Sequence, residues 1–343
     1  MSRRVLHILP HPGGGAETHI DLLERLPGYA HARASLSTGR TPAQGAASIP
    51  RNWPRILRAA RGADLVNVHG DLPAMLSIPM LRAGPSLWTT HGLHFSRRSH
   101  GLRGAAVRRA LAAACAAADV TVCTSRAERA ELAPLRAGRL EVVRNAIAPP
   151  APVDRAAVRA ELGLCGDTVA ILYLGQLEAR KDPLLAVRAA RAIPNATMLV
   201  AGDGPQRDEL AAAGARLLGF RRDPERLLAA ADILVMPSRH EGLSFAVLEA
   251  LASGAACVVS DGPGNPEAVG DAGIVFPAGD EAALHAALAR LAADPAQRER
   301  RAAAGRARAA AEFSVGRFLE RMGALYADAL AATGASAGAA PSA

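Results

Sequence analysis

The chain has 343 residues, of which 50% are apolar, 3% aromatic and 21% charged, and its formal net charge is +8. This length suits two domains with hydrophobic cores of their own. No apolar run reaches the roughly 20 residues that a membrane-spanning helix needs, and the apolar stretch near the N-terminus is too short for a signal peptide. The four cysteines lack metal-ligand spacing, so we expect buried thiols, no metal site and a reducing, cytoplasmic location.

Apolar runs alternate with helical stretches twice along the chain. The expected strands are 5–9, 34–37, 65–68, 86–90, 120–123 and 140–143, then 169–174, 196–201, 215–218, 233–236, 256–260 and 273–276. Such alternation is typical of an α/β fold with doubly wound parallel sheets, so we expect two Rossmann-like domains that face each other across a cleft. The proline-rich residues 146–153 are the expected linker. Helices should follow at 281–292, 295–312 and 313–330, and residues 331–343 should form a disordered tail.

The basic excess lies in the N-terminal half, where residues 1–150 carry 20 arginines against 9 acidic residues. Basic and apolar residues mix most closely over 94–109, at an expected loop and helix start. Two interpretations stay open: a solvated arginine-rich surface, and a face that meets an anionic acceptor or the anionic lipid of the inner membrane face. We expect no nucleic-acid binding, because the sequence has no aromatic stacking platform and no recognised reading motif.

Residues 238–261 carry the most informative pattern. Two carboxylates, Glu241 and Glu249, lie around the start of a short helix between two buried strands. Ser244 as N-cap and Gly254 after the last turn predict a helix of about eight residues. The free N–H groups and the dipole at its start favour an anion, and Glu249 is placed to grip a sugar hydroxyl as acidic residues do in other nucleotide folds. An ordinary helix with two surface carboxylates is the alternative.

This block resembles the signature of retaining glycosyltransferases of the GT-B fold, family 4, in which a Glu-Gly pair is followed by a second Glu eight positions after the first. The resemblance implies that domain 1–148 binds the acceptor, that domain 149–312 binds a nucleoside diphosphate sugar, and that the helix 313–330 crosses back to the first domain. It places Glu249 on the ribose and Glu241 on the transferred sugar. The other donor-binding residues that it implies here are Gly242, Leu243, Ser244 and Phe245.

Lys181 is the only lysine among 40 basic residues, and it follows the expected strand 169–174. Its presence could be chance. The family, however, places a phosphate-binding lysine here, after a Gly-Arg-Leu element, so the resemblance assigns Lys181 to the diphosphate. The sequence departs from the family at Gln176, which replaces the expected arginine. Arg180, beside Lys181, is the cation available to compensate.

A glycine-rich loop follows the first expected strand and directly precedes a helix. Gly14 and Gly15 allow a ligand to approach the backbone closely. The dinucleotide-binding fingerprint fails, because Thr18 stands where a third glycine or alanine is needed. The loop resembles the Gly-Gly-x-Glu element that faces the donor phosphates and the acceptor in the family; a plain tight turn is the alternative.

His91, within Thr-Thr-His-Gly, ends an expected strand, where open α/β sheets place ligand contacts. It matches the family histidine near the donor sugar, whereas a lone histidine at a strand end is otherwise a structural residue. With Lys181 and Glu241 it completes the expected catalytic set.

The chain has no Asp-x-Asp sequence, so a metal-bridged diphosphate site would lack its usual carboxylates. We expect no metal and no cofactor, with the leaving-group charge met by Lys181, Arg180 and the N–H groups near Ser244 and Phe245. The hypothesis is metal-independent, retaining transfer of a sugar to a glycan, a lipid-linked or a small-molecule acceptor. A nucleotide-sugar epimerase of the same architecture and a non-catalytic nucleotide-sugar binding protein remain as alternatives.

Overall fold

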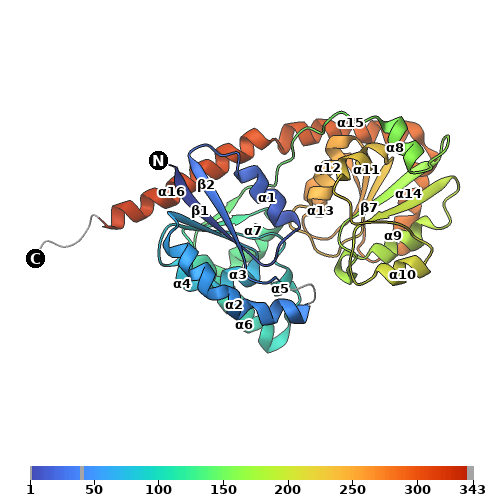
Figure 1. Cartoon of the computed structure of the whole chain (residues 1–343). Coiled ribbons are helices and arrows are strands. Elements are labelled where there is room, and N and C mark those ends of the chain that lie inside the picture. The colour runs from blue at the N-terminus through green and yellow to red at the C-terminus, as the bar shows by residue number, and fades with distance from the viewer. Residues whose placement is uncertain (1, 39–41, 338–343) are drawn as a thin grey trace, which may run out of the picture. The chain divides into compact units, whose positions relative to one another are not determined.

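The computed structural model describes residues 2–38 and 42–337 (Figure 1). The chain divides into two compact units. The N-terminal unit combines the residues up to Asn145 with those from Val315 onward, and the C-terminal unit is Ala146–Ser314. The division therefore falls a few residues before the expected boundary at 148/149. None of the helices in the described part of the chain is long and apolar enough to cross a membrane.

The N-terminal unit is built on a six-stranded parallel sheet in the order β2-β1-β3-β4-β5-β6. Its strands are β1 (Arg3–Leu9), β2 (Tyr29–Ser35), β3 (Leu65–His69), β4 (Ser86–Thr89), β5 (Val120–Cys123) and β6 (Leu140–Val142). Its helices are α1 (Gly15–Leu23), α2 (Pro42–Arg61), α3 (Asp71–Leu76), α4 (Ile78–Leu81), α5 (His94–Arg97), α6 (Gly101–Ala117), α7 (Arg126–Leu132) and α16 (Val315–Ala337). Helices cover both faces of the sheet (Figure 1), so the residues of its inner strands are buried on both sides, polar ones such as His7 and His69 included.

The edge strand β2 is the one whose position the sequence predicted poorly. It covers Tyr29–Ser35, whereas the expected strand was 34–37. An edge strand has one neighbour and is only partly buried, and β2 alternates between exposed and half-buried residues. It therefore lacks the continuous apolar run that revealed the other strands.

The C-terminal unit repeats the architecture with the strand order β12-β11-β10-β7-β8-β9. Its strands are β7 (Val169–Leu174), β8 (Ala196–Ala201), β9 (Arg216–Gly219), β10 (Ile233–Met236), β11 (Ala256–Ser260) and β12 (Ile274–Phe276). Its helices are α8 (Arg155–Glu161), α9 (Pro183–Ala190), α10 (Arg207–Ala212), α11 (Pro224–Ala230), α12 (Phe245–Ser253), α13 (Asn265–Val269), α14 (Glu281–Ala293) and α15 (Pro295–Glu312). Two six-stranded parallel sheets confirm the predicted pair of Rossmann-like domains.

Each sheet has a point where the strand order reverses. In the N-terminal unit the reversal lies between β1 and β3, and in the C-terminal unit it lies between β7 and β10. The loops that leave two such strands move apart to opposite faces of the sheet, which opens a crevice at their carboxyl ends. The reversal points are therefore where the fold itself favours a ligand.

The last helix, α16, belongs to the N-terminal unit and contacts β3, β4 and α1. Tyr326 of this helix is fully buried and accepts a hydrogen bond from the amide nitrogen of Asn67 at 3.1 Å. The helix continues to Ala337, past the expected end at residue 330, because this stretch is rich in alanine, the strongest helix former. The expected disordered tail 331–343 is thus helical in its first part, and residues 338–343 lie outside the described residues.

Candidate functional site

In the C-terminal unit, α12 starts directly after the loop that leaves β10. Ser244 is its N-cap residue and Gly254, with a φ of 83°, ends it in the left-handed conformation. The Ser244 side chain makes no capping hydrogen bond in the described part of the chain, contrary to the expected capping role. The first N–H groups of this nine-residue helix are therefore left for another acceptor.

Lys181 and Glu241 form an ion pair between Nζ and Oε1, with only 14% and 6% of their side chains exposed. Lys181 ends a 3₁₀ turn, η2 (Ala179–Lys181), which follows β7, and Glu241 lies in the loop after β10. Because β7 and β10 are neighbours, the reversal point of the sheet brings these two predicted residues together. A backbone hydrogen bond connects the turn η2 and the loop after β10 as well, because the N–H of Arg239 donates to the carbonyl of Arg180 at 3.0 Å.

The backbone around Glu241 and Gly242 is held by the loop that precedes α13. The N–H of Glu241 donates to the carbonyl of Pro263 at 3.2 Å. Gly264 has a φ of 87°, and a Cβ there would lie 1.8 Å from the carbonyl oxygen of Gly242. The two loops pack so closely that only glycine fits at 264. Leu243, the next predicted residue, is buried.

Gln176 and Arg180 are also in contact. Nη2 of Arg180 donates to Oε1 of Gln176 at 2.6 Å, and its Nε donates to Glu178 at 2.8 Å. The remaining guanidinium nitrogen, Nη1, is buried and has no hydrogen-bond partner among the described residues. The glutamine that replaces the family arginine therefore orients a guanidinium supplied four residues later.

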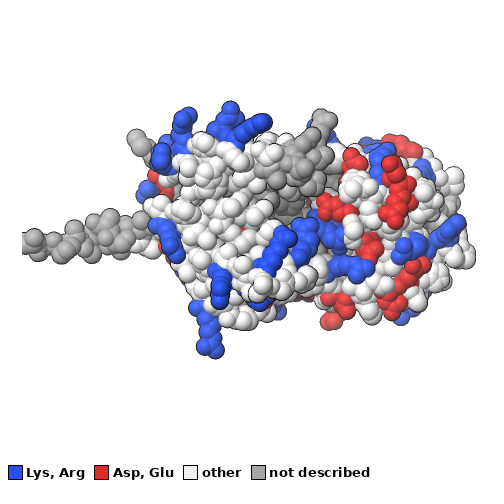
Figure 2. All heavy atoms as spheres, turned by 90° about the horizontal axis from the view of Figure 1, so that it is seen from below, with Lys and Arg blue, Asp and Glu red and all other residues white. Residues whose placement is uncertain are grey.

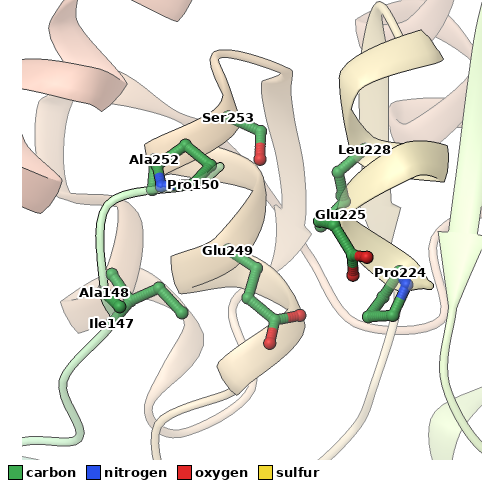
Figure 3. Close-up of a pocket in the computed structure, with 9 residues that line it drawn as sticks. All are labelled: Ile147, Ala148, Pro150, Pro224, Glu225, Leu228, Glu249, Ala252 and Ser253. Carbon is green, nitrogen blue, oxygen red and sulfur yellow. The ribbon is translucent and has the colours of Figure 1, made fainter. Parts of the chain in front are cut away.

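Glu249 projects from α12 into a cavity of about 150 Å³ between α12 and α11 (Figure 3). Glu225, at the start of α11, projects into the same space. Burial, and secondarily the charge of Glu225, raises the pKa of Glu249 to about 7. The walls are otherwise mostly apolar: Ile147, Ala148, Pro150, Pro224, Leu228, Ala252 and Ser253. A small cavity with a carboxyl group on an apolar wall suits a ring that carries hydroxyl groups.

In the N-terminal unit, Gly14 is the N-cap of α1 and has a φ of 84°, a conformation that favours glycine. Gly15 is the first residue of the helix. A Cβ at Gly14 would meet nothing within 4 Å, so the backbone faces open space there. This loop follows β1, one of the two strands at the reversal point.

His91 follows β4 and has a φ of 61°, which is uncommon for a residue other than glycine. Its Nε2 lies 2.9 Å from Nδ1 of His69, at the end of β3. Burial, and secondarily the charges of His19 and His94, lowers the pKa of His91 well below its ordinary value, so the ring is neutral at pH 7.

Glu128 is a site residue that the sequence did not reveal. It is fully buried, and its carboxylate accepts from the hydroxyl of Thr90 and the N–H of Gly92, on both sides of His91. It also accepts from the N–H and the hydroxyl of Thr124, at 2.7 and 2.8 Å. Burial raises its pKa even so. The hydroxyl of Ser125 accepts a hydrogen bond from the N–H of Glu128. The Ser-x-x-Glu spacing is typical of a capping box at a helix start. This local role is enough to explain the glutamate, so the sequence does not indicate its contacts around His91.

Comparison with known proteins links both units to one family. The model described as "Glycosyltransferase Family 4" matches residues 24–149, and that of "Glycosyl transferases group 1" matches residues 168–294. The chain is 31% identical over 305 residues to a 2-deoxystreptamine glucosyltransferase from Streptomyces kanamyceticus, covering 78% of this chain and 76% of that one. It is 36% identical over 159 residues to a Mycobacterium tuberculosis glycogen synthase, covering 42% of this chain but only 38% of the relative.

Among solved structures, the Anabaena protein HepE in complex with UDP-glucose superposes with a TM-score of 0.78 at 18% identity, over 96% of this chain and all of that one. The match supports the fold of each unit. With the two family models and the glucosyltransferase, it confirms the resemblance that the Glu-x₇-Glu block predicted. The chain belongs to the GT-B glycosyltransferases of group 1 and family 4.

Proposed function

We propose that the protein transfers a sugar from a nucleoside diphosphate sugar to an acceptor, with retention of configuration and without a metal ion. One observation carries the proposal: Lys181, Glu241 and the start of α12 all lie at the carboxyl ends of β7 and β10, where the sheet order reverses. A helix start with free N–H groups and a buried ammonium suit a diphosphate.

The roles within the donor site follow from the contacts. The ammonium of Lys181 has three N–H donors, and the ion pair with Glu241 uses one of them. The others are available to the diphosphate, whose charge grows as the sugar bond breaks. Glu241 then both orients Lys181 and accepts from a sugar hydroxyl. Nη1 of Arg180, which is buried and has no hydrogen-bond partner in the described part of the chain, is the second cationic donor.

Glu249 would bind the ribose hydroxyls from its cavity, and His91 would supply the N-terminal unit's contact with the reacting sugar. The sequence gives no obvious covalent nucleophile for a double displacement. A same-face displacement driven by stabilisation of the leaving diphosphate is therefore the mechanism that we propose. The relative crystallised with UDP-glucose makes UDP-glucose the first donor to test.

The acceptor side of the proposal includes contact with an anionic membrane surface or an anionic acceptor through α5 and α6. Leu102, at the start of α6, is 92% exposed, and Arg98 and Arg103 flank it. Figure 2 shows basic side chains spread over the N-terminal unit with few acidic ones, while both signs mix on the C-terminal unit. Flotation with anionic vesicles should carry the wild type but not the Leu102→Asp variant; equal flotation of both would refute this part.

The test of the function follows the donor itself, because slow transfer to water needs no added acceptor. UDP-glucose and the GDP-, ADP- and dTDP-sugars are incubated with the protein in EDTA, and the products are followed by proton NMR. We expect release of one nucleoside diphosphate together with the free sugar in the anomeric form of the donor. The opposite anomer would refute retention.

The same spectra separate the two alternatives. An epimerase converts the sugar while it stays on the nucleotide, and a binding protein leaves every donor intact although calorimetry detects its binding. Release of nucleoside diphosphate excludes both. Loss of release in EDTA, with recovery in Mg²⁺, would refute metal independence alone.

A further inference from the structure

Four histidines form a continuous row across the N-terminal sheet. Three lie on neighbouring strands, with His31 on β2, His7 on β1 and His69 on β3, and the fourth, His91, lies two residues after the end of β4. Ring nitrogens face each other at 2.8 Å between His31 Nδ1 and His7 Nε2, and at 2.8 Å between His7 Nδ1 and His69 Nε2. The row ends with 2.9 Å between His69 Nδ1 and His91 Nε2.

These distances are hydrogen bonds between imidazoles and not metal coordination. A metal ion that binds two imidazole nitrogens at about 2.0–2.1 Å in a tetrahedral site holds them about 3.3 Å apart, further than the 2.8 Å between His7 and His69. His7 and His69 are fully buried. Burial is the main cause that lowers the pKa values of all four rings. Neighbouring histidines add to it at His7, His69 and His91, whereas at His31 the charge of Glu24 partly opposes it. The row is therefore neutral.

A neutral imidazole carries one N–H donor and one bare acceptor nitrogen. His7 and His69 use both nitrogens within the row, so each must donate on one side and accept on the other. The row consequently has only two states, in which either every Nδ1 or every Nε2 carries the proton. The tautomer at one end fixes the tautomer at the other.

The far end of the row indicates which state is present. Nε2 of His31 is buried and has no partner among the described residues. Buried backbone N–H groups without a partner are rarer than carbonyls without one, and the same reasoning applies to a ring N–H. His31 therefore carries its proton on Nδ1 and donates to His7. Each ring donates to the next, and Nε2 of His91 accepts the last hydrogen bond.

His19 fixes the orientation of the same rings from the side. It stands edge-on to His91 at a centroid distance of 4.9 Å and to His69 at 5.8 Å. Its Nδ1 lies 3.0 Å from Oδ1 of Asn145, and its pKa is about 4, so it too is neutral. His19 packs against the row without being one of its links.

We propose that His31, His7 and His69 are positioning residues that hold His91 in the tautomer with the proton on Nδ1. His91 then offers a neutral N–H donor at the carboxyl edge of the sheet, and its other nitrogen is already occupied. A group of this kind donates to a sugar hydroxyl and does not act as a base. The kinetic consequence rests on the proposed function, whereas the tautomer is a property of the protein alone.

The direct test is NMR of the full chain labelled with ¹⁵N in its histidine rings. Ring shifts give the protonated nitrogen, and couplings through the hydrogen bonds give the direction of each link. We expect Nδ1–H on His91 and couplings from His31 through to His91. Absence of the couplings, or a proton on Nε2 of His91, would overturn the proposal.

Two variants at the far end test whether the tautomer is transmitted. His31→Asn still offers an N–H to His7, so His91 should keep its proton on Nδ1. His31→Asp, which is similar in size to His31→Asn, offers only an acceptor to His7. A neutral His7 must then donate to it and the whole row must reverse, and the ¹⁵N ring shifts of His7 show whether it is neutral or doubly protonated. An unchanged tautomer of His91 in H31D would overturn the proposal. Matching melting temperatures of the two variants would show that folding is not the cause.

Activity provides the second readout. If His91 donates to the sugar, the reversed row in H31D turns Nδ1 from a donor into an acceptor for the same hydroxyl. We expect kcat to fall by about tenfold relative to H31N, less than the 10²–10³ that loss of an oxyanion-hole donor costs, with KM for the donor unchanged. An equal kcat in the two variants, despite a reversed tautomer, would show that His91 does not use Nδ1. Wild-type protein without any transfer activity would refute the proposed function and leave the NMR result standing.

Discussion

The two units share a sheet architecture but build their candidate sites from opposite chemistries. In the C-terminal unit the residues at the reversal point are charged, with Lys181 paired to Glu241 and Arg180 beside them. In the N-terminal unit the corresponding place holds neutral imidazoles, although this half of the chain carries the basic excess. The net charge of a domain thus describes its surface and not its site. A diphosphate needs fixed positive charge, whereas a sugar hydroxyl needs an oriented neutral partner.

The largest effect should follow from Lys181→Met. Its loss removes the charge that meets the leaving diphosphate, so kcat should fall about 10²–10³-fold. It also removes the cation that pairs with the buried Glu241, which should lower the free energy of unfolding by about 3–5 kcal/mol. Steady-state kinetics and urea unfolding measure the two effects.

A double variant separates the effect on kcat from the effect on the free energy of unfolding. Lys181→Met combined with Glu241→Gln leaves no uncompensated charge and should recover most of the stability but none of the activity. Recovery of kcat in the double variant would mean that Lys181 serves the fold alone, and the charged character of this site would lose its functional meaning.

Among the residues around the neutral histidines of the N-terminal unit, Glu128 should be the most sensitive to substitution. Glutamine has one acceptor oxygen and an NH₂ group that faces donors, so it cannot serve the N–H groups of Gly92 and Thr124 together. We expect Glu128→Gln to lower the free energy of unfolding by about 2–3 kcal/mol and to lower kcat by displacing His91. Glu131→Gln, on the exposed side of the same helix, is the control; its amide oxygen can still accept from Arg97, so it should change stability by less than about 1 kcal/mol. Equal losses in both variants would contradict the role of Glu128.

Glu249 should make nucleotide binding depend on pH near neutrality. Its pKa is about 7, and the ionised form is the one that accepts from the ribose hydroxyls. Affinity for a nucleoside diphosphate should therefore rise about tenfold between pH 6 and pH 8. Glu225→Gln removes the neighbouring charge and should move this rise to lower pH. A pH-independent affinity, measured by calorimetry, would exclude Glu249 from the ribose site.

The same carboxyl predicts a gain in stability on substitution. Its pKa is raised from an ordinary 4.5 in the folded state, so the free energy of unfolding falls as the pH rises from 4.5 to about 7. Glu249→Gln removes this fall and should stabilise the protein at pH 8 by up to about 3 kcal/mol, since one pKa unit corresponds to about 1.4 kcal/mol. Thermal unfolding at pH 5 and pH 8 shows whether the gain is confined to the higher pH.

The smallest effect should come from removing the guanidinium group at residue 180 and then supplying one at residue 176. Arg180→Gln should raise KM for the donor about threefold to tenfold, by analogy with other charge-assisted contacts. Adding Gln176→Arg restores the family arrangement and should restore KM. If the double variant binds donor no better than Arg180→Gln, Arg180 does not compensate for the missing arginine.

The sequence predicted the buried parts of the fold well and the long-range contacts hardly at all. Continuous apolar runs such as 169–174 and 233–236 mark strands covered on both faces, and their positions were correct. The edge strand β2 gave no such run. The pairing of Lys181 with Glu241 needed the strand order, which places β7 beside β10 although they are far apart in the chain.

The histidine row shows why the neutral site was harder to predict than the charged one. In the sequence, His7 is a single histidine in an expected strand, and His31 and His69 lie outside the expected strands 34–37 and 65–68. Only the order β2-β1-β3-β4 aligns them with His91. Glu128 had a sufficient local explanation as part of a capping box. Ser244, conversely, has the sequence of a capping residue but makes no capping bond, since sequence gives the position of a cap and not the orientation of its side chain.

The central claim is that the charged residues of the C-terminal unit bind a nucleoside diphosphate. The most direct test is calorimetric titration of the wild type and Lys181→Ala with UDP, GDP, ADP and dTDP in EDTA. We expect one of these nucleotides to bind the wild type tightly without metal and at least tenfold more weakly to the variant, as loss of a charge-assisted contact requires. Failure of all four to bind the wild type, or equal binding by the variant, would contradict the account.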